Sequence, residues 1–214
     1  MIDPEIANLR QEYNKGGLRR SDVNHDPIAL FRLWLADARE AGQLEPNAMT
    51  LATVTDTGEP AARVVLLKNV DAGGFVFFTN YDSDKGQQIA ATGRATLVFW
   101  WDKLERQVRI SGAVEKVSAQ DSIDYFRSRP RASQLGAVAS PQSRLVDGRE
   151  ELESRLMAAE AEFAGQDVSR PEHWGGYRVV PESIEFWVGR RSRLHDRILC
   201  TRSGDEWQLS RLGA

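Results

Sequence analysis

The sequence has a single cysteine, Cys200, and only three histidines, which lie far apart among its 214 residues. One cysteine excludes an internal disulfide, and the expectation that follows is a reducing, cytoplasmic setting. His25, His173 and His195 share no metal-ligand spacing with the cysteine, so we do not expect a structural zinc site. Cys200 follows Leu199 in an apolar strand pattern, which predicts a packed thiol rather than a nucleophile.

The chain also lacks an excess of positive charge and a long apolar run. Its 28 Lys and Arg residues face 31 Asp and Glu residues, which gives a formal net charge of −3. A nucleic-acid surface needs a broad positive face, so any anion site here must be local. No apolar run approaches the length of a membrane span, and residues 1–6 have neither the basic nor the apolar region of a signal peptide.

The common nucleotide-binding and hydrolase motifs are missing as well. The chain has no G-x-G-x-x-G after a strand, no P-loop and no G-x-S-x-G. Any site for a nucleotide or another phosphate ligand must therefore be built from scattered residues.

The periodicity that is present predicts a single α+β domain, mainly β. Residues 3–14 are typical of a short polar helix or arm, and Asp26-Pro27 begins a helix that continues to about Ala41. Strands joined by short connections favour an antiparallel barrel, with helices around it, over a doubly wound parallel sheet. The strand patterns fall at 49–54, 61–67, 75–79, 95–101, 106–116, 177–180, 184–188, 197–201 and 207–212. Further helices are predicted at 83–91, from Ser118 to the break at Pro130, and at 149–163.

The segment from Tyr125 to Ser143 contains three arginines and no acid, although acids outnumber Lys and Arg in the chain. Arg127, Arg129 and Arg131 alternate around Pro130, and serines and glutamines follow. Arginine forks and neutral donors at this spacing suit a phosphate dianion. A basic loop that is merely solvated is the alternative reading of the same residues.

Four further clusters could bind ligands, and each has an ordinary structural alternative. Together they supply cations for two phosphates, with aromatic and amide groups suited to a flat heterocycle. Gln107 could hydrogen-bond a ring edge or simply lie on the surface, and Arg193, His195 and Arg197 would share one face if that segment is extended. The clusters are Arg63–Lys68; Phe78, Thr79, Ser83 and Lys85; Trp100–Arg109; and Glu185–Arg197.

In these residues the chain resembles the pyridoxamine 5′-phosphate oxidase family nearly from end to end. The resemblance implies an FMN-binding split β-barrel of the α+β class that works as a homodimer with FMN at the interface. It also implies oxidation of pyridoxamine 5′-phosphate or pyridoxine 5′-phosphate to pyridoxal 5′-phosphate, with O2 reduced to H2O2. The matching segments are 10–13, 16–20, 63–68, 105–109, 128–131, 133–134, 142–143, 174–176, 185–187, 193–197 and 211–212.

The resemblance also implies roles for individual residues of one domain, 1–214, in which residues 1–25 form an arm or lid over the barrel and helices of 26–214. The implied FMN contacts are Arg63, Val64, Val65, Leu66, Leu67, Lys68, Phe78, Thr79, Lys85, Gln107, Gln142, Ser143, Trp187 and Arg197. The implied substrate contacts are Arg10, Tyr13, Lys68, Tyr125, Arg129, Ser133, Arg193 and His195, of which Arg193 and His195 are the implied catalytic pair. Arg19 and Arg20 match a basic pair that some members use at a secondary product site.

One departure from the family pattern concerns the FMN phosphate. The family often has Arg-Lys where this chain has Asp84-Lys85, and an acid there would repel the phosphate unless its side chain points away.

Two other functions remain open for the whole chain: a different split-barrel flavoprotein, such as a flavin or deazaflavin reductase, and a non-catalytic carrier of FMN or pyridoxal phosphate. The former should lack the 128–133 and 193–197 motifs, and the latter would not need Arg193 with His195.

Overall fold

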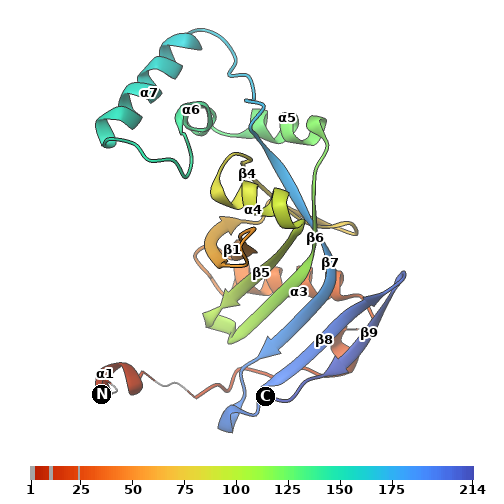
Figure 1. Ribbon diagram of the computed structural model, residues 1–214. Helices are drawn as coiled ribbons and strands as arrows, with labels where there is room; N and C mark the ends of the chain where they lie inside the picture. The colour runs from red at the N-terminus through yellow and green to blue at the C-terminus, as the bar shows by residue number, and fades with distance from the viewer. Residues whose placement is uncertain (1–2, 10–11, 24) are drawn as a thin grey trace.

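A curled antiparallel sheet forms the body of the protein in the computed structural model, which describes residues 3–9, 12–23 and 25–214 (Figure 1). The sheet order is β2-β1-β5-β6-β7-β4-β3, and β8 and β9 extend it from β7. The strands are β1 (Ala48–Val54), β2 (Pro60–Leu66), β3 (Asn69–Asp71), β4 (Gly74–Asn80), β5 (Arg94–Trp101), β6 (Arg106–Lys116), β7 (Trp174–Val188), β8 (Asp196–Ser203) and β9 (Glu206–Arg211). This mainly β split-barrel architecture confirms the predicted fold class.

Helices pack around the sheet and at one of its ends. Figure 1 shows α5, α6 and α7 together at one end of β7, while the N-terminal arm lies at the other end, near the turn that joins β7 to β8. The helices are α1 (Pro4–Ala7), α2 (Arg20–Val23), α3 (Pro27–Glu40), α4 (Asp84–Thr92), α5 (Ala119–Ser128), α6 (Arg131–Ala139) and α7 (Arg149–Glu162), with short 3-10 turns η1 (Asp102–Leu104) and η2 (Arg191–Arg193). Within the described ranges no helix is both long and apolar enough to cross a membrane.

The core lies between the sheet and α3. Asp26 caps α3 by accepting a hydrogen bond from the backbone N–H of Ala29, and Pro27 occupies its first turn, as predicted. Phe31 of α3 is fully buried and meets Phe75 and Phe99 edge to face, with ring centroids 4.8 and 4.9 Å apart. The apolar stripe of α3 therefore closes the open side of the curled sheet.

The prediction of two strands at 177–180 and 184–188 was wrong, because β7 is one continuous strand from Trp174 to Val188. Pro181, which lies between the two predicted strands, is opposite Gly112 where the register between β6 and β7 shifts. A proline is tolerated at such an irregularity because no ladder N–H is required of it. Gly112 is needed there, since a Cβ atom would lie 1.9 Å from the carbonyl oxygen of Val180.

The other predicted elements agree with the structure to within two residues at each end. Three elements were not predicted: α6, which follows at once after the break at Pro130, and the short elements α2 and β3. Among the described residues of 3–14, which the pattern predicted to form a helix or arm, helix is found at Pro4–Ala7.

Candidate active site

Polar residues from β2, β4, α4 and the loop after α6 meet in a cluster that we call the anion pocket. Lys85 is only 9% exposed, and its Nζ donates to Ser83 Oγ (3.1 Å) and to Gln142 Oε1 (2.7 Å). Thr79 Oγ1 also donates to Gln142 Oε1 (3.3 Å). The members of the anion pocket are Arg63, Thr79, Ser83, Lys85 and Gln142.

Arg63 reaches the anion pocket from β2 without meeting a carboxylate. Its guanidinium donates to Thr53 Oγ1 (2.5 Å) and Gln88 Oε1 (3.0 Å), and within the described residues neither Arg63 nor Lys85 has an ion-pair partner within 4 Å. Burial lowers the pKa of Lys85, and the positive charge of Arg63 lowers it further. Two partly buried cations that repel each other are typical of a site built for an anion.

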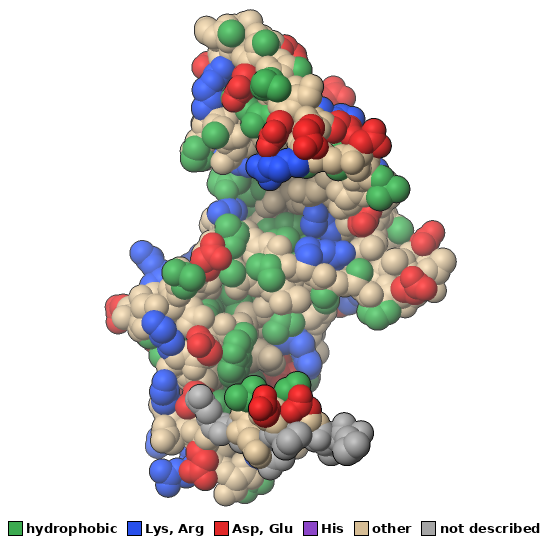
Figure 2. Space-filling view, turned by 90° about the vertical axis from the view of Figure 1, so that its left-hand side faces the viewer, with side chains coloured by type: hydrophobic (Ala, Val, Ile, Leu, Met, Phe, Trp, Pro, Cys, Tyr) green, Lys and Arg blue, Asp and Glu red, His purple; other side chains and the backbone are tan. Residues whose placement is uncertain are grey.

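A stack of aromatic rings borders the anion pocket. Phe78 lies in β4 directly before Thr79, and its ring lies 4.0 Å from that of Tyr125 on α5 at an interplanar angle of 25°. The guanidinium of Arg129 lies 4.6 Å from the ring centroid of Trp174. Figure 2 shows Lys and Arg side chains beside a hollow under the helical end of the molecule.

Arg129 has an unused hydrogen-bond donor. Its Nη1 is buried and, in the part of the chain that the structure describes, has no hydrogen-bond partner. Burial lowers the pKa of Arg129, because the charged guanidinium is partly removed from water. Buried donors are rarely left unpaired, so an acceptor from a ligand is expected there. Lys68 and Ser133, two further residues of the implied substrate contacts, are exposed.

A second group of predicted site residues lies at the opposite end of β7. Trp187 and His195 have ring centroids 4.6 Å apart, and Tyr13 of the arm packs against both at 5.7 Å. Gln107 lies opposite Trp187 in the β6–β7 ladder, and Arg197 lies opposite Trp187 in the β7–β8 ladder.

Arg197 is held by a carboxylate that the sequence analysis quoted but gave no role. Glu185 is 3% exposed, and its Oε1 accepts a hydrogen bond from Arg197 Nε at 2.8 Å. Its other oxygen pairs with Arg109. Glu185 therefore fixes the direction of the Arg197 guanidinium, and a single acid inside the apolar strand segment 184–188 was the available sequence signal.

The segment around Arg193 differs from the extended conformation that the sequence analysis considered. Ser192 and Arg193 have φ angles of 55° and 59°, and β8 begins only at Asp196. Left-handed backbone at two successive side-chain-bearing residues is uncommon and is found preferentially at functional sites. The tight turn brings Arg193 near enough to His195 to lower the pKa of the imidazole, to which burial contributes more.

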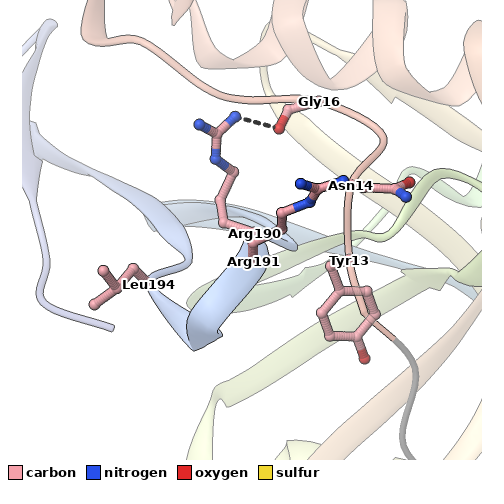
Figure 3. Close-up of a pocket in the computed structure, with 6 residues that line it drawn as sticks. All are labelled: Tyr13, Asn14, Gly16, Arg190, Arg191 and Leu194. Atoms are coloured by element: carbon pink, nitrogen blue, oxygen red, sulfur yellow. Dashed lines mark hydrogen bonds between the residues drawn. The ribbon is translucent and has the colours of Figure 1, made fainter.

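Arg190, which sequence reasoning missed, connects this turn to the N-terminal arm. Its backbone N–H donates to His195 Nδ1 (3.2 Å), and its Nη1 donates to the carbonyl oxygen of Gly16 (2.5 Å). Figure 3 shows this contact together with Tyr13 and Asn14 of the arm. The neighbouring pocket is lined by Leu9, Glu12, Tyr13, Arg190, Arg191, Ser192, Arg193 and His195.

The structure thus brings the predicted residues into two groups, not one. Phe78 lies opposite Gly176, near one end of β7, and Trp187 lies near the other end. At about 3.3 Å per residue, the path along the strand from Gly176 to Trp187 is roughly 35 Å.

The remaining candidates differ in exposure. Val64 is exposed, Val65 and Leu66 are half-buried, and Leu67 is buried. Ser143 has a φ of 65°, and Arg10 lies outside the described residues.

Comparisons with known proteins identify the family. A sequence model described as Pyridoxamine 5'-phosphate oxidase matches residues 35–162, and one described as Pyridoxine 5'-phosphate oxidase C-terminal dimerisation region matches residues 174–213. The chain is 58% identical over 213 residues to the pyridoxine/pyridoxamine 5'-phosphate oxidase of Gloeothece citriformis, covering 99% of each chain.

Two solved structures share the fold of this chain. The crystal structure of PhzG from Burkholderia lata 383, in complex with tetrahydrophenazine-1-carboxylic acid, is 29% identical with a TM-score of 0.87, over 94% of this chain and 100% of that one. A pyridoxamine 5'-phosphate oxidase-related, FMN-binding protein from Nostoc punctiforme shares the fold at a TM-score of 0.68 and 18% identity, over 86% of this chain and 97% of that one. The chain therefore belongs to the pyridoxamine 5'-phosphate oxidase family.

Proposed function

We propose that this protein uses FMN to oxidise pyridoxamine 5′-phosphate or pyridoxine 5′-phosphate to pyridoxal 5′-phosphate. The observation that carries the proposal is the buried Nη1 of Arg129, which has no partner among the described residues and lies beside the stacked rings of Phe78 and Tyr125. A guanidinium with a free N–H next to aromatic faces suits a ligand that joins a phosphate to a flat ring. Relatives such as the pyridoxine/pyridoxamine 5'-phosphate oxidase of Gloeothece citriformis are named for the same activity.

The anion pocket fits the phosphate of FMN. Arg63 and Lys85 supply two cations with no ion-pair partner within 4 Å among the described residues, while Thr79 and Ser83 supply hydroxyl groups. Gln142 holds the Lys85 ammonium in place at 2.7 Å. When bound, FMN supplies the hydride acceptor for the substrate and passes the electrons to O2, which yields hydrogen peroxide.

A homodimer is part of the proposal, because one copy of the chain separates the two groups of site residues. The anion pocket and Arg129 lie near one end of β7, whereas Trp187, Arg193 and His195 lie near the other. One small ligand cannot reach both ends within a chain. A second copy, placed so that its Trp187 end meets the first copy's anion pocket, would complete the site, and the match to a family dimerisation region over 174–213 supports this arrangement.

The residues of the second group would position and activate the substrate. Arg193 is our candidate for holding the substrate ring and assisting removal of its proton, and His195 would assist by hydrogen bonding. Because the Arg190 N–H occupies Nδ1, neutral His195 carries its ring proton on Nε2 and acts there as a donor. Tyr13 would cover the substrate from the arm.

The test is oxygen uptake and peroxide release with each phosphate substrate, with and without added FMN. We expect the wild type to take up oxygen and release peroxide with the phosphate substrates. Arg193→Ala should strongly lower kcat, and Lys68→Ala should act mainly on KM. A colourless protein that binds pyridoxal phosphate without turnover would indicate a carrier instead. Unchanged turnover in Arg193→Ala would contradict the catalytic assignment.

A further inference from the structure

An acidic residue lies at the rim of the anion pocket, where it opposes the proposed ligand. Asp84 is the first residue of α4 and directly precedes Lys85. Its charge acts on both cations of the pocket, Arg63 and Lys85, and raises the pKa of each against the larger effect of burial. The same negative charge would repel a phosphate bound between them.

Arg144 lies against this acid. Its Nη1 is 3.6 Å from Asp84 Oδ1, and its Nη2 donates to the carbonyl oxygen of Asp82 at 2.5 Å. The two contacts place the guanidinium at the N-terminal end of α4, where Ser83 of the anion pocket caps the helix. The Asp84 side chain is 58% exposed and that of Arg144 is 46% exposed, so both remain in contact with solvent at the rim.

The loop that carries Arg144 is also part of the pocket. Gln142, two residues earlier, accepts the hydrogen bond from Lys85, and Ser143 between them has a φ of 65°. The backbone N–H of Arg144 donates to the carbonyl oxygen of Pro141 at 2.9 Å, which closes a tight turn. One short loop therefore sets both the amide that orients Lys85 and the guanidinium that faces Asp84.

The charges of these four groups show what Arg144 contributes. Arg63 and Lys85 give +2, Asp84 reduces the sum to +1, and Arg144 restores +2. A phosphate monoester carries about −1.5 to −2 at pH 7, so the restored sum matches it. We propose that Arg144 is a binding residue of the anion pocket that offsets Asp84 and gives the pocket its preference for a dianionic phosphate ester over the uncharged alcohol.

This inference rests on the proposed function, since it takes the FMN phosphate as the ligand of the pocket. The alternative is an ordinary exposed ion pair, which contributes little to stability and nothing to ligand choice. The two readings differ in one measurable respect. Substitution of a pocket residue changes the affinity for FMN. The affinity for riboflavin, which lacks the phosphate, stays the same.

The experiment measures binding of FMN and of riboflavin to the flavin-free protein by quenching of flavin fluorescence. We expect Arg144→Gln to weaken FMN binding roughly tenfold with riboflavin affinity unchanged, and Asp84→Asn to strengthen FMN binding. The double variant Asp84→Asn/Arg144→Gln has the wild-type sum of +2 and should recover most of the lost affinity. Arg144→Lys keeps the charge and should bind FMN within about threefold of the wild type.

Arg94→Gln is the matched control, because Arg94 forms an exposed ion pair with Glu182 away from the pocket and should leave FMN affinity unchanged. Circular dichroism melting of each variant separates loss of folding from loss of binding. The inference is overturned if Arg144→Gln binds FMN as the wild type does, if riboflavin affinity falls equally, or if the double variant does not recover. A wild-type protein that binds neither flavin would instead overturn the proposed function, and this inference with it.

Discussion

The backbone N–H of Arg190 donates a hydrogen bond to Nδ1 of His195 at 3.2 Å, while the side chain of the same arginine binds the N-terminal arm at Gly16. One residue thus sets the tautomer of the histidine and anchors the segment that carries Tyr13. The main-chain and side-chain roles can be tested separately, because substitution of Arg190 removes only the second.

His195 should titrate below its ordinary pKa of 6.5, since burial and then the positive charge of Arg193 both disfavour the imidazolium. We expect the acidic limb of the kcat/KM profile to have its midpoint below that value. As the pH falls, His195 is protonated in the unfolded chain before it is protonated in the folded protein. The stability that neutral His195 contributes above pH 6.5 is therefore lost as the pH falls through the lowered pKa of the folded state. Ring NMR titration checks this, and Arg193→Gln should raise the pKa; an unmoved titration in that variant would contradict the assigned cause.

Arg190→Ala should release the arm without changing the tautomer of His195. The hydrogen bond to the Gly16 carbonyl disappears, whereas the backbone N–H at position 190 remains. We expect tryptic cleavage after Lys15 to become several-fold faster and KM to rise, with the pH midpoint unchanged. Equal cleavage rates in variant and wild type would show that the arm is held by other contacts.

Arg129→Gln should raise KM for the phosphate substrates by roughly 10- to 100-fold, which corresponds to the loss of one charge-assisted hydrogen bond of about 1.5–3 kcal/mol. FMN affinity should change little. Arg131→Gln is the control, because its guanidinium binds the carbonyl oxygens of Phe163 and Gln166 at the end of α7. Similar KM values for the two variants would remove Arg129 from the phosphate site.

Glu185→Gln should destabilise the fold by roughly 2 kcal/mol, less than the 3–5 kcal/mol typical of a fully buried pair, because both arginine partners remain partly solvated. Urea denaturation measures this directly. The exposed Glu182→Gln variant, which breaks the pair with Arg94, should lose less than about 1 kcal/mol. The variant at Glu185 should also weaken flavin binding through the loosened Arg197.

Cys200 should be unreactive in the folded protein. Its thiol is completely buried, and burial raises its pKa to about 12, so the thiolate is scarce at neutral pH. Titration with a thiol reagent at pH 8 should detect no thiol in the native state and one in urea. A fast native reaction would mean that β8 opens readily.

Local sequence patterns determined most of the elements and indicated which residues are candidates for the site. The Asp26-Pro27 start of α3, the Ser83 cap of α4 and the limits of β6 follow from interactions within a few residues, which is why they could be predicted. The resemblance to the family pointed to Arg129, Lys85, Trp187 and His195, because the order of its motifs can be read from the sequence without the structure. That the sheet is antiparallel and barrel-like followed from the short connections between strands, whereas the split barrel was implied by the resemblance to the family.

Tertiary structure alone decided the continuity of β7 through Pro181, the left-handed turn at Arg193 and the pairing of Asp84 with Arg144. Each depends on a partner distant in sequence: the register shift at Gly112 on β6, the arm fixed by Arg190, or the loop that follows α6. It also decided that the site residues form two separate groups. Periodicity reports which face of a strand a residue occupies, whereas the length of β7, set by its pairing with β4, β6 and β8, places the two groups near its opposite ends.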